Sequence, residues 1–362
     1  MGDLPEAGVG SIVVLLVVGE THSTQNRAPK GMWVRVPPWL IFVIGTGVHR
    51  GEPMSDRLHY SQILDVTHWL AVNDEPMGTK PKFWLRTESG EDWLFKKKHR
   101  LHSDDDCTEK IASELAVLFG LPHATVELAQ RNGERGIVTR DIVAECEAEA
   151  LIHGNSLLVE VDPEYPSGDF YHVANHTIDR IFSVFAARCV GLPPGTEART
   201  ELADGRDLFT GYLLFDAWIG NTDRHHENWA VLKFAVDRFV LAPSYDHASS
   251  LGHNLQDSER ADRLVSKDRN RTVEAYAAKA RSALFRSEAD KKPASTDEAF
   301  ALATVSCRKA GRYWLNRLRE ISDDAATDIV NRVPDGLLSP HGKRFAVQLL
   351  RANRARLLKA TI

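Results

Sequence analysis

Two short polar segments hold the residues whose types and spacing could do chemistry: 220–228, GNTDRHHEN, and 244–246, SYD. They supply Asp223, then Asn228 five residues later, and Asp246 beyond an apolar stretch. Phosphoryl transfer needs a residue that positions the attacking hydroxyl, together with hard oxygen ligands for magnesium. We therefore predict Asp223 as a catalytic base, and Asn228 and Asp246 as magnesium ligands.

These residues need elements that bring them together. Residues 208–219 have apolar side chains at helical spacing and end at Gly220, which predicts a helix leading into the Asp223 loop. Residues 229–234 and 238–241 have the character of two strands around the turn 235–237. A hairpin there would return Asp246 to Asn228.

The spacing of Asp223 and Asn228 equals that of the kinase catalytic loop. By itself it is a weak signal, because Asp and Asn in a polar loop usually serve as a helix cap and a turn. A hydrolase metal site made by Asp223, His225 and His226 is an alternative interpretation.

The rest of the chain divides into a β-rich part and a helical part. We predict strands at 63–72, 82–87, 92–97, 125–129 and 136–140, with a helix that Thr108 caps and Gly120 ends. Further helices are expected at 176–189, 272–285, 297–320, 323–332 and 340–360, and the highly charged stretch 257–271 is expected to be a mobile loop. The predicted domains are an extension of uncertain structure (1–58), a nucleotide-binding N-lobe (59–150) and a helical catalytic C-lobe (151–362).

The patterns Asp-x-His-x-x-Asn at 223–228 and Pro-x-Tyr-Asp at 243–246 resemble the HipA-like serine/threonine kinase family over about residues 60–360. The resemblance implies an α+β, two-lobed fold similar to protein kinases and phosphatidylinositol 3/4-kinases. It also implies ATP and Mg²⁺ as cofactors. By position, Asp223 would be the base, Asn228 and Asp246 would hold magnesium, and His225 would brace the loop.

The nucleotide side of the site follows from the same resemblance. Lys96 comes directly after the apolar triplet 93–95 and is the favoured ATP-binding lysine, with Lys97 and Lys98 as alternatives. Strand alternation places Lys96 and Lys98 on one face and Lys97 on the other. Glu109 is the expected acidic partner of the lysine, and Glu114 is its competitor.

A loop over the phosphates is the last expected part of the nucleotide site. Residues 78–82, from Gly78 to Lys82, resemble the family's Gly-x-x-x-Lys loop. The chain departs from the HipA toxins at Glu75, where they carry a self-phosphorylated Ser. Residues 1–58 are unlike their large N-terminal subdomain, so we expect a short form of the family.

The expected acceptor is a Ser/Thr hydroxyl of a protein. In the toxins the target is typically an aminoacyl-tRNA synthetase, and the partner is a DNA-binding antitoxin. The resemblance therefore implies a translation factor as the substrate of a toxin-like growth regulator. A phosphoinositide or small-alcohol kinase and an inactive nucleotide-binding module are the alternatives, since a fold does not fix a substrate.

Composition sets limits on location and partners. The net charge of -5 predicts no direct nucleic-acid contact, and we interpret the basic residues of 340–360 as a solvated face. The four cysteines form no close pair, which favours a reduced, cytoplasmic location. The apolar runs 12–18 and 39–48 are shorter than the ~18 residues of a membrane span.

Overall fold

The computed structural model describes residues 62–74, 82–98, 103–169 and 171–359. One compact unit spans Arg57–Ile362. The predicted extension at 1–58 and the predicted phosphate-loop residue Gly78 lie outside the described residues.

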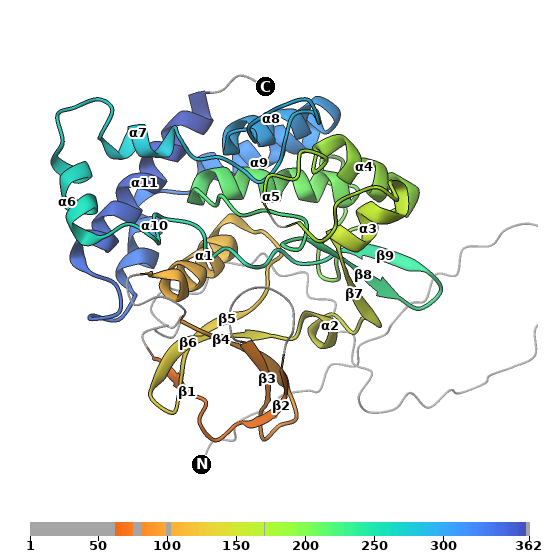
Figure 1. Ribbon diagram of the computed structural model, residues 1–362, viewed down its shortest axis with the longest axis horizontal. Helices are drawn as coiled ribbons and strands as arrows, with labels where there is room; N and C mark the ends of the chain where they lie inside the picture. The colour runs from red at the N-terminus through yellow and green to blue at the C-terminus, as the bar shows by residue number, and fades with distance from the viewer. Residues whose placement is uncertain (1–61, 75–81, 99–102, 170, 360–362) are drawn as a thin grey trace, which may run out of the picture. The chain divides into compact units, whose positions relative to one another are not determined.

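The N-lobe is a six-stranded sheet in the order β1-β5-β6-β4-β3-β2 (Figure 1). β1 and β5 are parallel, and the other neighbours are antiparallel. Its strands are β1 Leu64–Asp65, β2 Leu70–Asp74, β3 Lys82–Arg86, β4 Asp92–Lys97, β5 Val126–Arg131 and β6 Glu134–Arg140. In the register of β3 and β4, Lys82 lies opposite Lys96, so these two side chains share one face of the sheet.

Helix α1, Asp105–Phe119, follows β4 in the chain and ends at Gly120, which has a φ of 77°. The prediction that Thr108 caps this helix is wrong, because the helix begins at Asp105, three residues earlier. The side chains of Asp105 and Asp106 favour that earlier start, since they lie near the positive end of the helix dipole. The Thr108 hydroxyl instead donates to the Ala248 carbonyl at 2.7 Å, which joins α1 to the segment after Asp246.

The C-lobe is mainly helical and holds a small antiparallel sheet, β7-β8-β9. Its strands are β7 Ala150–His153, β8 Ala230–Phe234 and β9 Arg238–Leu241; α2, Ile142–Glu145, precedes β7. The helices are α3 Gly154–Val161, α4 Ile178–Ala187, α5 Gly205–Ile219, α6 Asp257–Val265, α7 Val273–Ala277, α8 Thr296–Ser306, α9 Arg308–Glu320, α10 Asp323–Asn331 and α11 Pro340–Lys359.

One loop prediction and two helix predictions in the C-lobe need correction. The stretch 257–271 is not all loop, because α6 forms there with a capping box between Gln256 and Glu259. The helix predicted at 297–320 is two helices, since the backbone of Cys307 leaves the helical conformation. The helix predicted at 272–285 is only the short α7.

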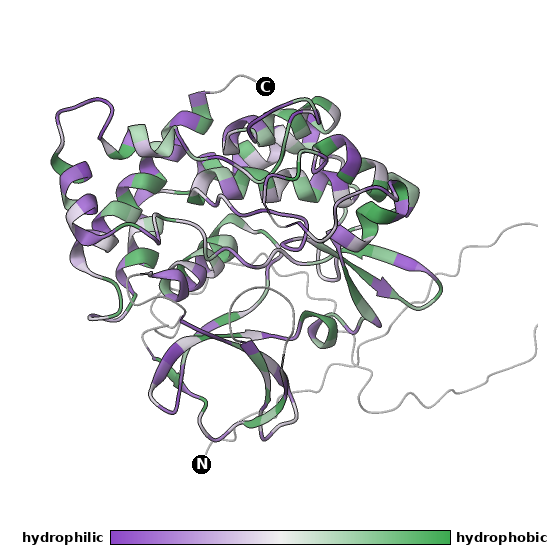
Figure 2. Ribbon diagram, viewed as in Figure 1, coloured by the Kyte–Doolittle hydropathy of each residue, from purple (hydrophilic) through white to green (hydrophobic). Residues whose placement is uncertain are grey.

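Helix α5 lies inside the C-lobe and positions the site. Asp204 caps its start, with a side chain that accepts from the amides of Arg206 and Asp207, and Gly220 caps its end with a φ of 68°. Almost all of its residues are buried among α1, α8, α9 and α11. In Figure 2 the outer helix α6 is mostly hydrophilic.

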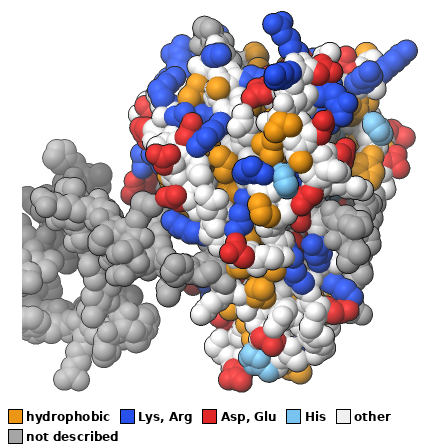
Figure 3. All heavy atoms as spheres, turned by 90° about the vertical axis from the view of Figure 1, so that its left-hand side faces the viewer, with side chains coloured by type: hydrophobic (Ala, Val, Ile, Leu, Met, Phe, Trp, Pro, Cys, Tyr) orange, Lys and Arg blue, Asp and Glu red, His pale blue; other side chains and the backbone are white. Residues whose placement is uncertain are grey.

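The face of the molecule on the α6 and α11 side carries interspersed basic and acidic side chains (Figure 3). Basic residues of α11 lie within 4 Å of carboxylates: Lys343, Arg351, Arg354 and Arg356. These contacts are typical of a solvated helix face. No helix among the described residues is long and apolar enough to span a bilayer.

Candidate active site

The loop after α5 holds the predicted base. The Asp223 amide donates to Asn221 Oδ1 at 3.2 Å, which fixes the backbone just before the side chain. The Asp223 carboxylate accepts from the Ser249 hydroxyl at 3.3 Å and is partly exposed. A carboxylate in this state can accept a proton or orient a hydroxyl group.

Asn228 is buried at the end of the same loop. Its Nδ2 donates to the Asp223 carbonyl at 2.6 Å. This bond sets the orientation of the amide group, because only the nitrogen can donate. Oδ1 is thereby the amide atom that points away from the Asp223 carbonyl, and it is a hard oxygen that suits magnesium.

Asp246 follows the β8–β9 hairpin and joins the two lobes. Its carboxylate Oδ2 lies 3.2 Å from Lys96 Nζ of β4. Burial alone would lower the pKa of Lys96, but the carboxylates of Asp246 and Glu109 outweigh it and raise that pKa. Asp246 has a φ of 56°, a left-handed conformation that Asp tolerates better than most residues.

The structure also separates the three neighbouring lysines. Lys97 points to the opposite face of the sheet from Lys96 and forms an ion pair with Glu134. Lys98 interacts electrostatically with Asp106. Of the three, Lys96 is the one that the structure brings to Asp246.

The two candidate acidic partners on α1 have different surroundings. Glu109 is buried, interacts electrostatically with Lys96 and has its Oε1 3.9 Å from His247 Nδ1. Glu114 instead pairs with the buried Lys110 at 2.8 Å. Glu109 therefore lies near Lys96 at the site, whereas Glu114 interacts with Lys110.

His225 and Lys82 complete the predicted set. The Glu227 amide donates to His225 Nδ1 at 3.1 Å, which closes the loop on itself. Burial lowers the pKa of His225 to about 4, so the ring is neutral at pH 7. Lys82 lies near this loop, since it interacts electrostatically with both His225 and Glu227.

Helix α3 supports the loop from its other side. The amides of Gly154 and Asn155 donate to the carbonyls of Trp229 and His226, each at 3.0 Å. A side chain at Gly154 would place its Cβ 2.3 Å from the Trp229 ring, so this close approach requires glycine.

Comparison with known proteins identifies the family. The model of the HipA-like C-terminal domain matches residues 75–310. The chain belongs to this family. No curated protein matches the HipA-like chain.

Solved structures share the fold of this HipA-like chain. The Helicobacter pylori proinflammatory kinase CtkA has a TM-score of 0.62 at 17% identity, covering 83% of this chain and all of its own. HipA of Shewanella oneidensis MR-1, in a complex with HipB and operator DNA, has a TM-score of 0.48 at 13% identity, covering 80% of this chain and 66% of its own. The likeness to CtkA shows that the α+β fold is kinase-like.

The described residues of the HipA-like chain contain no group of three or more His, Cys, Asp or Glu side chains that could hold a metal by themselves. Asn228 and Asp246 offer an amide oxygen and a carboxylate. Magnesium is often held by one or two such groups together with substrate phosphates and water, so this donor set fits it.

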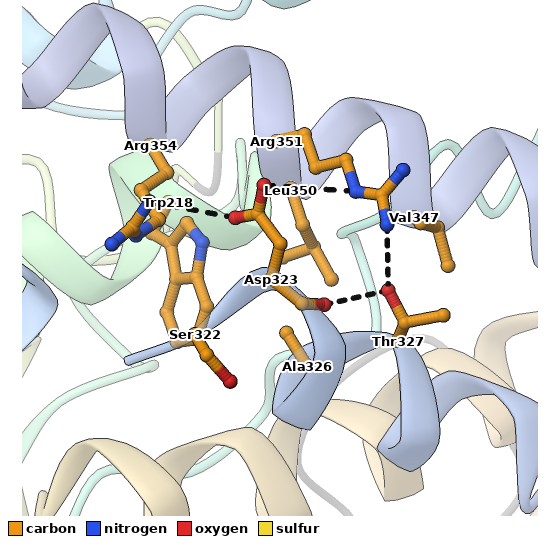
Figure 4. A pocket seen from close by; sticks show the side chains of 9 residues that line it. All are labelled: Trp218, Ser322, Asp323, Ala326, Thr327, Val347, Leu350, Arg351 and Arg354. Atoms are coloured by element: carbon orange, nitrogen blue, oxygen red, sulfur yellow. Dashed lines mark hydrogen bonds and ion pairs between the residues drawn. The ribbon is translucent and has the colours of Figure 1, made fainter. Parts of the chain in front are cut away.

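A small cavity elsewhere in the C-lobe does not compete with this site. It lies among α5, α10 and α11, next to Trp218, Asp323 and Arg354 (Figure 4). Its volume of about 10 Å³ holds one water molecule at most. It cannot accept a nucleotide.

Sequence reasoning assigned no role to two residues that hold the loop together. Arg224 is buried beside the predicted base and forms a bidentate ion pair with Asp216 of α5. The usable signal was Asp216 itself, the one carboxylate within the otherwise apolar run 208–219. A lone carboxylate on a buried helix face predicts a buried cation as its partner.

Proposed function

We propose that this HipA-like chain is an ATP- and magnesium-dependent kinase that transfers the γ-phosphate to a Ser or Thr hydroxyl of a protein. The observation that carries the proposal is the 3.2 Å ion pair between Lys96 and Asp246. It joins the predicted phosphate-binding lysine of the N-lobe to the predicted magnesium ligand of the C-lobe. Phosphoryl transfer depends on such groups meeting at one point.

Each residue then has one task. Asn228 and Asp246 would hold magnesium, which neutralises charge on the phosphates when bound. Lys96 would bind phosphate oxygens, with Glu109 beside it. Asp223 would orient the acceptor hydroxyl and take its proton, while the neutral His225 keeps the loop closed.

A protein acceptor is supported by membership of the HipA-like family. By the same reasoning we propose a toxin-like growth regulator, with a translation factor such as an aminoacyl-tRNA synthetase as its target and a DNA-binding antitoxin as its partner. A cell that grows normally while it makes the active chain would argue against the regulatory part of this proposal.

The test is transfer from γ-labelled ATP with magnesium in a cell lysate, with the Asp223→Ala protein as a matched control. We expect label on one or a few protein bands that is absent with the control. Label in the lipid or small-molecule fraction would favour the alternative acceptors. No label with the wild-type protein, in lysate or with purified candidate acceptors, would overturn the kinase assignment.

A further inference from the structure

We propose that the buried pair of Arg224 and Asp216 is a positioning unit that holds the base and both magnesium-ligand segments in register. This inference rests on the proposed function. The side chains of Arg224 and Asp216 are 1% and 5% exposed. Arg224 Nε and Nη2 donate to the two Asp216 carboxylate oxygens at 2.8 and 2.7 Å, and this bidentate geometry fixes the plane of the guanidinium.

The remaining donors of Arg224 connect the two ligand segments. Nη1 donates to the Asn228 carbonyl at 2.6 Å and to the Tyr245 carbonyl at 3.2 Å. Nη2 also donates to the Ser244 hydroxyl at 3.1 Å. A single planar group therefore sets the distance between the end of the Asp223 loop and the residue that precedes Asp246.

The bond to Tyr245 has a specific effect on Asp246. The Tyr245 carbonyl belongs to the peptide group that precedes Asp246. The left-handed φ of 56° at Asp246 is a rotation relative to this peptide, and it is sparsely populated without support. By holding the carbonyl, Arg224 holds the peptide plane and with it the direction of the Asp246 side chain.

Asp216 supports the other end of the loop. Its Oδ1 accepts from Asn221 Nδ2 at 2.8 Å, and Asn221 Oδ1 in turn accepts from the Asp223 amide at 3.2 Å. The segments that carry Asp223, Asn228 and Asp246 thus share one buried support. Lysine cannot replace arginine there, because an ammonium group has three donors on a point charge and no planar fork.

The contribution of this pair to positioning is separable from its contribution to stability. A buried ion pair contributes little compared with apolar residues of similar size, although removal of one partner alone is costly. Replacement of both partners by apolar residues therefore separates positioning from folding. A purely structural pair would leave kinase activity intact in such a variant.

The test compares Arg224→Lys with Arg260→Lys. Arg260 is 4% exposed, pairs with Asp104 at 2.6 Å and donates to the Gly252 carbonyl, so it is matched in burial and in partner types. We expect Arg224→Lys to lower kcat roughly 100-fold and to raise the magnesium concentration for half-maximal turnover about tenfold. Arg260→Lys should keep both values, with a similar loss of thermal stability.

Other results overturn the inference. The inference fails if the Arg224→Lys protein keeps the wild-type kcat and magnesium dependence. It also fails if Arg224→Lys and Arg260→Lys lose kcat to the same extent. If Arg224→Lys does not fold, the double variant Asp216→Leu/Arg224→Met takes its place, and a folded, fully active double variant is equally decisive against the proposal. Failure of both to fold would assign the pair to folding alone. If the wild-type protein does not turn over ATP, the proposed function and this inference both fail. If the wild-type protein is active, the variants test the inference alone.

Discussion

The two lobes contribute to the site in different ways. In the C-lobe, hydrogen bonds tie Asn228 to the Asp223 carbonyl, and Arg224 links the same loop to the Tyr245 carbonyl. From the N-lobe, Lys96 reaches Asp246 across the lobes through an ion pair. The C-lobe half is thus built by its own buried groups, whereas the N-lobe half depends on contact between the lobes. Changes in the C-lobe should therefore mainly alter the chemistry, and changes in the N-lobe mainly nucleotide binding.

Asp246 belongs to both halves, so its replacement should have the largest effect. We expect Asp246→Asn to lower ATP turnover by about 10³-fold or more, because a predicted metal ligand and the Lys96 counter-ion are lost together. Magnesium-dependent nucleotide binding should fall as well, as measured by calorimetry with and without magnesium. If Asp246→Asn binds Mg-ATP normally and turns it over, the metal assignment is wrong.

Asp223 should separate chemistry from binding. Asp223→Ala removes a predicted base and no predicted nucleotide contact, so turnover should fall by roughly 10²–10⁴-fold while ATP affinity stays within about twofold. Single-turnover kinetics and nucleotide titration on the same preparation measure the two quantities. Equal losses in both would place Asp223 among the binding residues.

Lys96 tests the N-lobe half. Lys96→Ala should weaken ATP binding by roughly 10–100-fold, because a charge-assisted contact worth ~1.5–3 kcal/mol is lost. Lys97→Ala is the matched control, since Lys97 pairs with the exposed Glu134 and such pairs contribute little. Unchanged affinity for Lys96→Ala would move the assignment to a neighbouring lysine.

The smallest expected effect is on how the free energy of unfolding depends on pH, through the buried His176. Burial lowers the pKa of His176 to about 3, and the Trp229 indole donates to its Nε2 at 3.1 Å, which requires a neutral ring nitrogen. The unfolded chain binds this proton near pH 6.5, so His176 makes the free energy of unfolding fall as pH drops from about 6.5 towards 3.

His176→Gln should flatten that dependence by up to about 1.4 kcal/mol per pH unit between pH 6 and 4. Denaturant unfolding at several pH values measures it. An identical slope for His176→Gln and wild type would show that His176 titrates normally.

Local patterns carried the sequence predictions that agree with the structure. The structure gives β4 the predicted bounds. Its apolar residues are followed directly by a run of lysines, and this local change of character marks the strand end. The order of helix, loop and hairpin around Asp223 also follows from spacing and from Gly220 as a helix end. The kinase-like α+β fold could thus be predicted from the order of elements and a few motif residues.

Features that depend on three-dimensional packing could not be predicted. The break between α8 and α9 falls at Cys307, where the sequence has no Gly or Pro to mark it. Helix α6 is a local case instead, since a capping box starts it within a highly charged segment that reads as a loop. The pairing of Arg224 with Asp216 joins an expected loop to an expected buried helix face. Only the folded structure shows that they meet.

The ion pair between Lys96 and Asp246 has a consequence for ligand selection under the proposed function. In this state the two groups serve as each other's counter-ions. A metal ion alone would take Asp246 and leave the ammonium of Lys96 beside a second cation, whereas a free nucleotide would bring its phosphates against the carboxylate. A metal–nucleotide complex carries a cation for Asp246 and phosphates for Lys96, so it replaces their one ion pair by two. The site should therefore bind the preformed metal–nucleotide complex in preference to either component alone.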